Sequence, residues 1–172
     1  MGTHTVARRN DVRRSLDAIR QIVRVLRLGA AWAERELGLS GAQLFVLEKL
    51  GDGKAVSVNE LAERTHTHQS SVSVVVQRLV QRRLVRRVRS STDARRAELT
   101  ITPAGLQKLR GAPMVAQHKL IASLTTMSHS DRQQLARLLE RLVEGTGMSQ
   151  TAPALFFEDG SKTKGSNSRH GG

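Results

Sequence analysis

The sequence predicts a mainly α-helical protein that carries one small β-hairpin. Apolar residues recur every three or four positions over most of the chain, which is the period of an amphipathic helix. A helix predicted from about His68 leads into an arginine-dense run, 82–87, and a second apolar-alternating run, 97–102, follows after a polar loop. A helix followed by a basic hairpin is the plan of a winged helix-turn-helix, in which the helix enters the DNA major groove and the hairpin reaches the next groove.

The charge balance favours a polyanionic partner. Lysine and arginine number 28 against 15 acidic residues, which gives a formal net charge of +13, and nucleic acid is the usual polyanion. One Trp, three Phe and no Tyr are too few aromatic side chains for a membrane-surface helix or for base stacking on RNA. These counts favour double-stranded DNA.

Several classes of protein are excluded by what the sequence lacks. The absence of cysteine removes disulfides, thiolate nucleophiles and thiol redox switches. No carboxylate pair, glycine-rich phosphate loop or metal cluster has a useful spacing, so we expect no enzyme, no cofactor and no metal. No apolar run approaches the roughly 20 residues that span a bilayer, and no signal-peptide core opens the chain. We expect a soluble, cytoplasmic protein.

The chain divides into a winged helix-turn-helix, 39–102, between two groups of outer helices, 11–38 and 103–147. The first outer helix carries a long apolar stripe and closes near Gly38. Such a stripe packs either on its own domain or on a second subunit, and we favour dimerisation. Residues 1–10 are expected to be flexible and 148–172 disordered, although the tail contains an apolar patch, 154–157, that could dock.

Local signals place the helix boundaries. Capping boxes are predicted to start helices at Ser40, Ser57 and Ser130. Pro103 at a first helical position starts another, with Leu106 and Leu109 turned inward until Gly111 and Pro113 interrupt it.

The helix that begins near His68 is the predicted recognition helix. Its buried side is expected to consist of valines and Leu79, which leaves a polar outward face. That face comprises Gln69, Ser70, Ser71, Ser73, Val74, Gln77, Arg78 and Gln81. Hydroxyls near a helix start donate to phosphate, glutamine pairs with adenine, a valine fits a thymine methyl and an arginine reaches guanine or phosphate. The alternative is an ordinary polar helix face.

The predicted hairpin region contains three motifs, Leu84-Val85-x-Arg87, Asp93-x-Arg95 and Ile101-Thr102-x-x-Gly105. In this order they resemble the wing of the MarR family of multiple-antibiotic-resistance regulators, and the resemblance extends more loosely over 11–147. It implies a homodimeric winged-helix protein that binds DNA, often a repressor released by a small aromatic or phenolic ligand. It also implies that Asp93 orients Arg95 into the minor groove, with Arg89 and Arg96 beside them. A solvated hairpin tip is the alternative.

Two residues depart from the family pattern. Ala94 replaces a frequent basic residue, which removes one possible phosphate contact. Arg83 stands where a glycine commonly ends the recognition helix, so the turn into the wing is expected to be built differently.

A ligand site is the least defined expectation. The resemblance implies a pocket between each DNA-binding unit and the dimerisation helices, where a small aromatic acid could bind. Candidate contacts are Trp32 and the arginines Arg20, Arg24 and Arg27, which are alternatively a packing residue and solvated side chains. His66 and His68 have a weak metal-ligand spacing, and a helix start is the simpler account of them.

The sequence thus predicts a sequence-specific DNA-binding transcription regulator, a homodimeric repressor at a pseudo-palindromic duplex site. The alternative is an architectural DNA-binding protein with little sequence preference, whose basic charge would look the same.

Overall fold

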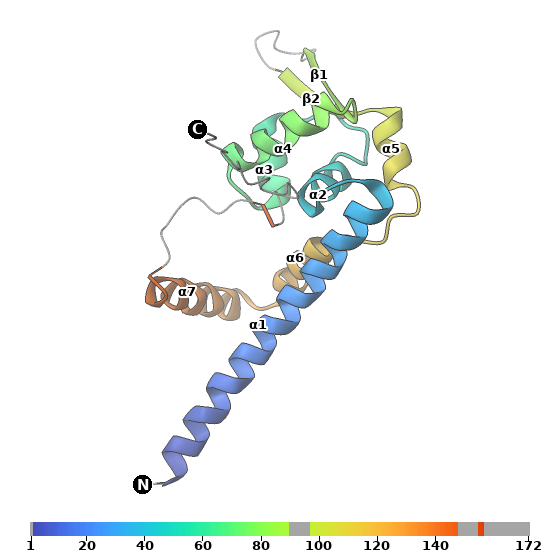
Figure 1. Ribbon diagram of the computed structural model, residues 1–172. Coiled ribbons are helices and arrows are strands. Elements are labelled where there is room, and N and C mark those ends of the chain that lie inside the picture. The colour runs from blue at the N-terminus through green and yellow to red at the C-terminus, as the bar shows by residue number, and fades with distance from the viewer. Residues whose placement is uncertain (1, 90–96, 148–154, 157–172) are drawn as a thin grey trace, which may run out of the picture.

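The helix α1, Gly2–Leu37, is the longest element, and its C-terminal end carries the winged-helix unit (Figure 1). The computed structural model describes residues 2–89, 97–147 and 155–156. Residues 2–10 are helical and extend α1 by more than two turns, and the flexibility expected for this segment stays a prediction. Gly38 ends the helix with φ +64°, as predicted, and the Leu39 N–H donates to the Ala33 carbonyl at 3.1 Å.

The remaining elements confirm a mainly helical winged-helix fold. They are α2 (Gly41–Lys49), α3 (Val58–Thr65), α4 (Gln69–Gln81), β1 (Val85–Arg89), β2 (Ala97–Ile101), α5 (Pro103–Leu109), α6 (Ala116–Thr126) and α7 (His129–Gly145). The strands are antiparallel, with Val85 opposite Ile101 and Arg89 opposite Ala97. The predicted hairpin is therefore present, and it stands beyond α4 at the end of the molecule away from the N-terminus (Figure 1).

A short third segment joins the hairpin and was missed by the sequence analysis. Val56 forms two backbone hydrogen bonds with Leu99, of 3.1 and 2.7 Å. Val56 is a single bridging residue after a glycine-containing turn, which is too short to produce an alternating pattern. It fixes the base of the wing to the α2–α3 connection.

Helix α2 lies at the centre of the unit, and all residues from Ala42 to Leu47 are buried. It contacts α1, α3, α4 and α5, so its surface is covered on every side. Phe45, Leu61 and Leu79 are among the fully buried side chains of this core, and each typically contributes about 1.5–3 kcal/mol when removed from water. The core therefore holds α4 in a fixed position relative to α1.

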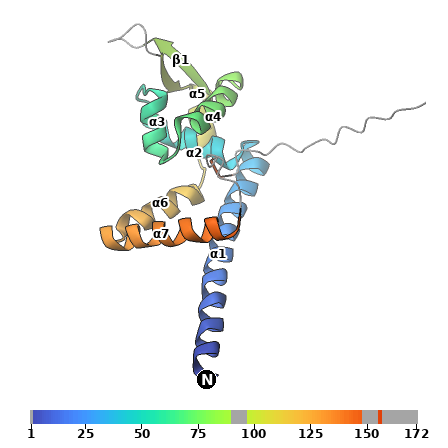
Figure 2. The same cartoon turned by 90° about the vertical axis from the view of Figure 1, so that its left-hand side faces the viewer.

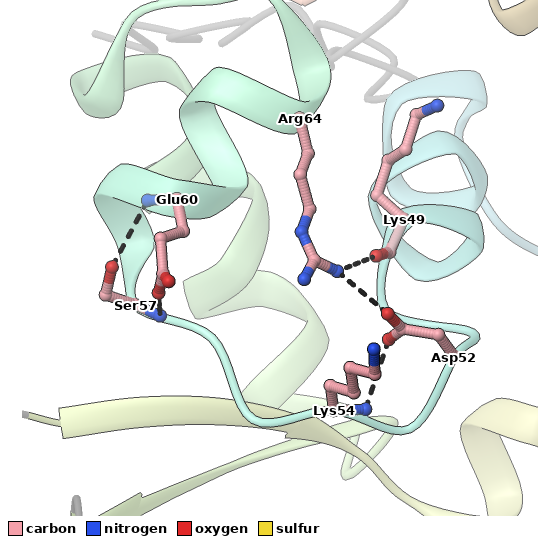
Figure 3. Close-up of polar contacts among 6 residues, drawn as sticks. All are labelled: Lys49, Asp52, Lys54, Ser57, Glu60 and Arg64. Carbon is pink, nitrogen blue, oxygen red and sulfur yellow. Dashed lines mark hydrogen bonds and ion pairs between the residues drawn. The ribbon is translucent and has the colours of Figure 1, made fainter. Parts of the chain in front are cut away.

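The turn between α2 and α3 is held by polar contacts that Figure 3 shows. Arg64 of α3 donates to the Lys49 carbonyl at 3.1 Å and pairs with Asp52 at 3.3 Å. The backbone N–H of Lys54 donates to the Asp52 carboxylate at 3.1 Å. The ion pair is partly exposed, so it contributes less than about 1 kcal/mol, and its effect is to shape the turn that leads to Val56.

Two of the three predicted capping boxes are confirmed. Ser40 with Gln43 starts α2, and Ser57 with Glu60 starts α3, each with both reciprocal hydrogen bonds (Figure 3 for Ser57). The box predicted at Ser130 is wrong. Ser128 is the N-cap of α7, and its hydroxyl accepts from the Asp131 N–H at 3.1 Å, so Ser130 falls inside the helix.

Helix α5 starts at Pro103 as predicted, with Thr102 as its N-cap. Leu106 is 39% exposed, so its expected inward position is wrong. Gly105 makes the close contact instead. A Cβ at Gly105 would lie 2.3 Å from the Leu84 carbonyl oxygen, so α5 packs its glycine face on the start of the wing. The break expected around Gly111 and Pro113 is present, because α6 begins at Ala116.

The turn from α4 into β1 keeps a left-handed residue although no glycine stands there. Arg83 has φ +58°. The Arg83 N–H donates to the Val80 carbonyl at 2.9 Å, and the Leu84 N–H donates to the Leu79 carbonyl at 3.0 Å. These two bonds form a Schellman motif. The expectation of a differently built turn is therefore wrong, because the backbone bonds impose the glycine conformation on an arginine.

We expect Arg83→Gly to raise the free energy of unfolding by about 0.5–1 kcal/mol, because a side chain in the left-handed region is strained. Arg83→Ala removes the same charge and keeps the strain, so it is the matched control and should leave stability nearly unchanged. Urea unfolding of the three proteins measures the difference. Equal midpoints for the glycine and alanine variants would show that the turn is not strained.

Candidate nucleic-acid interface

Most of the predicted outward face of α4 is accessible. Gln69, Ser70 and Gln77 are exposed, and Ser73 and Arg78 are half-buried. Val74 is 41% exposed in a helix whose other valines largely pack in the core. An exposed apolar side chain among polar neighbours fits a surface that meets base edges in a groove.

Ser71 does not belong to this face. It is 8% exposed and lies with Val72, Val75 and Leu79 on the buried side of α4. The outward orientation predicted for it is wrong. Ser71 precedes Val75 by four residues, and residues four apart share one face of a helix. A small polar residue at this position lets the first turn of α4 pack closely on the core.

The two histidines beside α4 have backbone roles. His66 ends α3 in the left-handed conformation, with φ +51°. His68 is the N-cap residue of α4, but its side chain makes no capping hydrogen bond. The positive end of the helix dipole is thus not covered by its own capping side chain, a condition that favours an approaching anion such as phosphate.

The described part of the wing is strongly basic. Arg86, Arg87 and Arg89 are all exposed on β1. Strand alternation puts Val85, Arg87 and Arg89 on one face, so this face changes from core to cationic surface toward the tip. Arg86, on the other face, donates to the Thr100 hydroxyl of β2 at 3.0 Å.

Three predicted wing residues fall outside the described part of the chain. They are Asp93, Arg95 and Arg96. Their assignment stays a prediction from the resemblance, and among the predicted wing residues only Arg89 is placed by the structure.

Arg82 connects α4 to the end of α1, a role that the sequence analysis missed. Its Nη1 donates to the Gly38 carbonyl at 2.7 Å and to the Gln43 side-chain oxygen at 3.1 Å. The same Gln43 oxygen accepts the Ser40 N–H of the capping box, also at 3.1 Å. The partners lie 39 and 44 residues away in sequence, so no local pattern could have indicated the contact.

We expect Arg82→Ala to weaken DNA binding and to lower the free energy of unfolding by about 1 kcal/mol, because the variant cannot form the exposed charge-assisted bond between α4 and α1. Arg82→Lys is the control, since it keeps the charge but replaces the guanidinium, whose Nη1 makes both bonds, by an ammonium group with a shorter reach. If DNA binding depends on how Arg82 holds α4 against the end of α1, the lysine variant should also bind DNA more weakly in a fluorescence anisotropy titration. Parental affinity in the lysine variant would mean that only charge counts.

An apolar crevice lies between α1, α2 and the α5–α6 connection. Trp32 and Leu26 of α1, Leu44 of α2 and Val115 of the connection are among its lining residues, and its volume is about 40 Å³. Of the candidate ligand contacts expected from the sequence, only Trp32 lines this crevice. Arg20 and Arg27 lie on another face of α1, beside Ile19 and other apolar residues, and are not among the crevice residues.

One of these arginines already has a partner. Arg20 pairs with Asp17 at 2.8 Å on the same helix. The structure therefore does not bring the candidate ligand residues together within one chain.

Apolar faces on two outer helices remain uncovered in the single chain. On α1 the exposed apolar residues include Leu16, Ile22 and Leu28, and on α7 Leu138 and Leu142 are 52% and 51% exposed. Helix α7, which is described in full, has no buried residue. A strongly amphipathic helix without a covered apolar face requires a partner surface.

The arrangement of a helix-turn-helix, a basic hairpin and long outer helices defines a winged helix-turn-helix protein. The family model described as "MarR family" matches residues 37–96. The chain is 28% identical over 137 residues to the HTH-type transcriptional repressor MdtR of Bacillus subtilis (strain 168), over 78% of this chain and 85% of the relative. The resemblance to the MarR family is thus confirmed, and it is centred on the winged-helix segment.

Solved structures with this fold align with most of the chain. The transcriptional regulator BldR from Sulfolobus solfataricus has 25% sequence identity and a TM-score of 0.52, over 77% of this chain and 96% of that one. The fold is also that of S. aureus MepR in a DNA complex, at 17% identity and a TM-score of 0.50, over 74% and 95% of the two chains. MdtR is named as a transcriptional repressor and BldR as a transcriptional regulator, in agreement with a regulator and not an enzyme.

No helix in the described ranges is long and apolar enough to cross a membrane.

Proposed function

We propose that the protein is a sequence-specific transcription regulator that binds duplex DNA as a homodimer and represses at a pseudo-palindromic site. The observation that carries this is the accessible face of α4, with Gln69, Val74 and Gln77 exposed and the basic strand β1 directly following. An α-helix fits the major groove, where side chains of these types distinguish base pairs. The similarity to the repressor MdtR supports repression.

The proposed DNA contacts are of two kinds: some side chains read base edges, and others position the protein on the phosphates. Gln69 and Gln77 pair with adenine and Val74 contacts a thymine methyl, while Ser70 and Ser73 donate to phosphates and Arg78 reaches guanine or phosphate. In the wing, Arg89 and Arg96 neutralise phosphates, and Arg95, oriented by Asp93, enters the minor groove. Ser71 does not touch the DNA in this proposal, because its side chain is buried.

The dimer forms through the uncovered apolar faces of α1 and α7. A two-fold axis gives each half-site the same recognition helix, about 34 Å from its partner along the DNA. The position of the outer helices supports this, because α7 and the N-terminal half of α1 lie away from the winged-helix unit (Figures 1 and 2). As a DNA-binding transcription regulator, the protein acts in the cytoplasm.

A small aromatic or phenolic ligand releases the DNA by binding the crevice beside Trp32. The crevice touches both α1 and the α5–α6 connection, so its occupancy can change the angle between the winged helix and the dimerisation helices. A ligand shifts the equilibrium only by its different affinity for the two conformations. Titration of salicylate-like acids against the bound operator tests this part, and no release at millimolar concentrations would leave a regulator without such a ligand.

Footprinting in the presence of excess random-sequence duplex distinguishes a regulator from an architectural DNA-binding protein. A regulator keeps one protected segment on its operator under this competition, because specific affinity exceeds nonspecific affinity by roughly 10³–10⁷. Loss of all protection at the lowest competitor concentrations would favour the architectural function.

A further inference from the structure

The C-terminal segment returns to the winged-helix core through two adjacent apolar residues. Leu155 is 3% exposed and belongs to the buried core cluster. Phe156 is 50% exposed and forms part of the wall of the crevice beside Trp32. In both views the short coloured piece at 155–156 lies beside α2 (Figures 1 and 2). The two described residues of the apolar patch, Leu155 and Phe156, therefore contact the winged-helix core and the crevice.

The crevice as the structure shows it is too small for a ligand of ordinary size. With Phe156 in its wall, about 40 Å³ remains, whereas small-molecule sites typically have about 300–1,000 Å³. The other walls are almost entirely apolar, with Leu26, Trp32 and Met114 among them. Such walls suit an aromatic or aliphatic group, and Phe156 of the same chain forms part of the wall.

We propose that the segment containing Leu155 and Phe156 is a built-in occupant of this crevice, which a small aromatic ligand must displace. The docking itself stands on the burial of Leu155. Its consequence for regulation rests on the ligand control proposed above. One buried leucine and one half-exposed phenylalanine remove far less apolar area from water than a core helix does, so the segment can be displaced without unfolding the domain.

The crevice lies where the winged helix meets the outer helices, so replacing Phe156 by a ligand can change how these parts pack on each other. Its walls come from α1, from Gly41 and Leu44 of α2, and from 113–117, which lead into α6. Residues 155–156, docked at this junction, therefore brace the winged helix against α1 and α6. Replacement of the tail by a ligand changes what fills this junction.

Trp32 is the only tryptophan of the chain and lines the crevice, so its fluorescence reports on docking directly. In the full chain, Leu155→Asp should raise the acrylamide quenching constant of Trp32 roughly twofold, because the half-buried indole loses its cover. Leu106→Asp, which places the same charge at an exposed leucine of α5, is the matched control and should leave quenching unchanged. Leu155→Ala should give a smaller change in the same direction.

The competition is measured with the aromatic anion 1-anilinonaphthalene-8-sulfonate as probe. If the tail is docked about 90% of the time, the Leu155→Asp chain should bind the dye about tenfold more tightly than the parent. A synthetic peptide with the sequence of residues 151–160, added at millimolar concentration to match an intramolecular segment, should restore Trp32 protection and displace the dye. Peptide rescue also excludes general unfolding of the variant.

Unchanged quenching and unchanged dye affinity in Leu155→Asp would overturn the proposal, as would increased quenching that the peptide cannot reverse. DNA binding is measured in the same samples without dye. If neither protein selects a DNA site while quenching and rescue behave as expected, the proposed regulator function fails and the docked tail stands.

Discussion

Raising the salt concentration from 50 to 200 mM should weaken operator binding by roughly 10³–10⁵-fold, on the basis of about 6–10 phosphate contacts in the dimer. Each lysine or arginine that neutralises a phosphate releases condensed counterions, and this release becomes less favourable as salt rises. The exposed arginines of β1 and the formal net charge of +13 provide these contacts. Fluorescence anisotropy with a labelled operator gives the slope of log affinity against log salt.

A pair of charge-matched variants assigns the slope to the wing. Arg87→Ala should reduce the slope by about one for each phosphate that the arginine neutralises in the parent. Arg137→Ala removes the same charge from an exposed position on α7 and should leave the slope nearly as in the parent. A nearly flat profile in the parent, or equal slopes in the two variants, would contradict the assigned binding surface.

Placing a charge on the apolar face of α7 should have the other large effect. Leu138→Asp should produce a monomer, because an unpaired carboxylate is then placed in the proposed subunit contact. Binding to the full operator should fall by roughly 10²–10⁴-fold, since the second half-site no longer binds at a high effective concentration. Sedimentation equilibrium and gel shifts measure the two consequences.

The control for this change is Gln133→Asp on the polar side of the same helix. Leu138 and Gln133 are both exposed in the single chain, so the two aspartate substitutions should disturb folding of the single chain equally little. A difference between the two variants in oligomeric state then reports on the subunit contact. A Leu138→Asp protein that remains dimeric would show that α7 does not form the contact.

The local elements were predictable where one signal dominated. The capping boxes of α2 and α3 and the closure of α1 at Gly38 each had a single suitable residue. Two serines compete at the start of α7, Ser128 and Ser130, and only the folded structure distinguishes them. The wing's third segment depends on two hydrogen bonds between Val56 and Leu99, which are distant in sequence.

In the candidate site, too, the local features could be predicted from the sequence and the contacts between distant residues could not. The outward position of Val74 and Gln77 follows from the helical period, and strict use of that period would also have put Ser71 inside. The role of Arg82 could not be predicted, because its partners come from the α1–α2 turn, far away in the chain. The docking of Leu155 is likewise a tertiary contact, for which the sequence offers only an apolar patch.

Selection of bound sequences from a random duplex library tests the central claim most directly. The parent should enrich an inverted repeat whose half-sites are centred about 10–10.5 base pairs apart. Val74→Ser and Gln77→Ala should change the preferred bases within each half-site, at about 1–3 kcal/mol per altered contact. Arg95→Ala should instead weaken binding and relax preference only at flanking A·T steps. An unenriched library, or the same half-site in the parent and both α4 variants, would contradict sequence reading by α4.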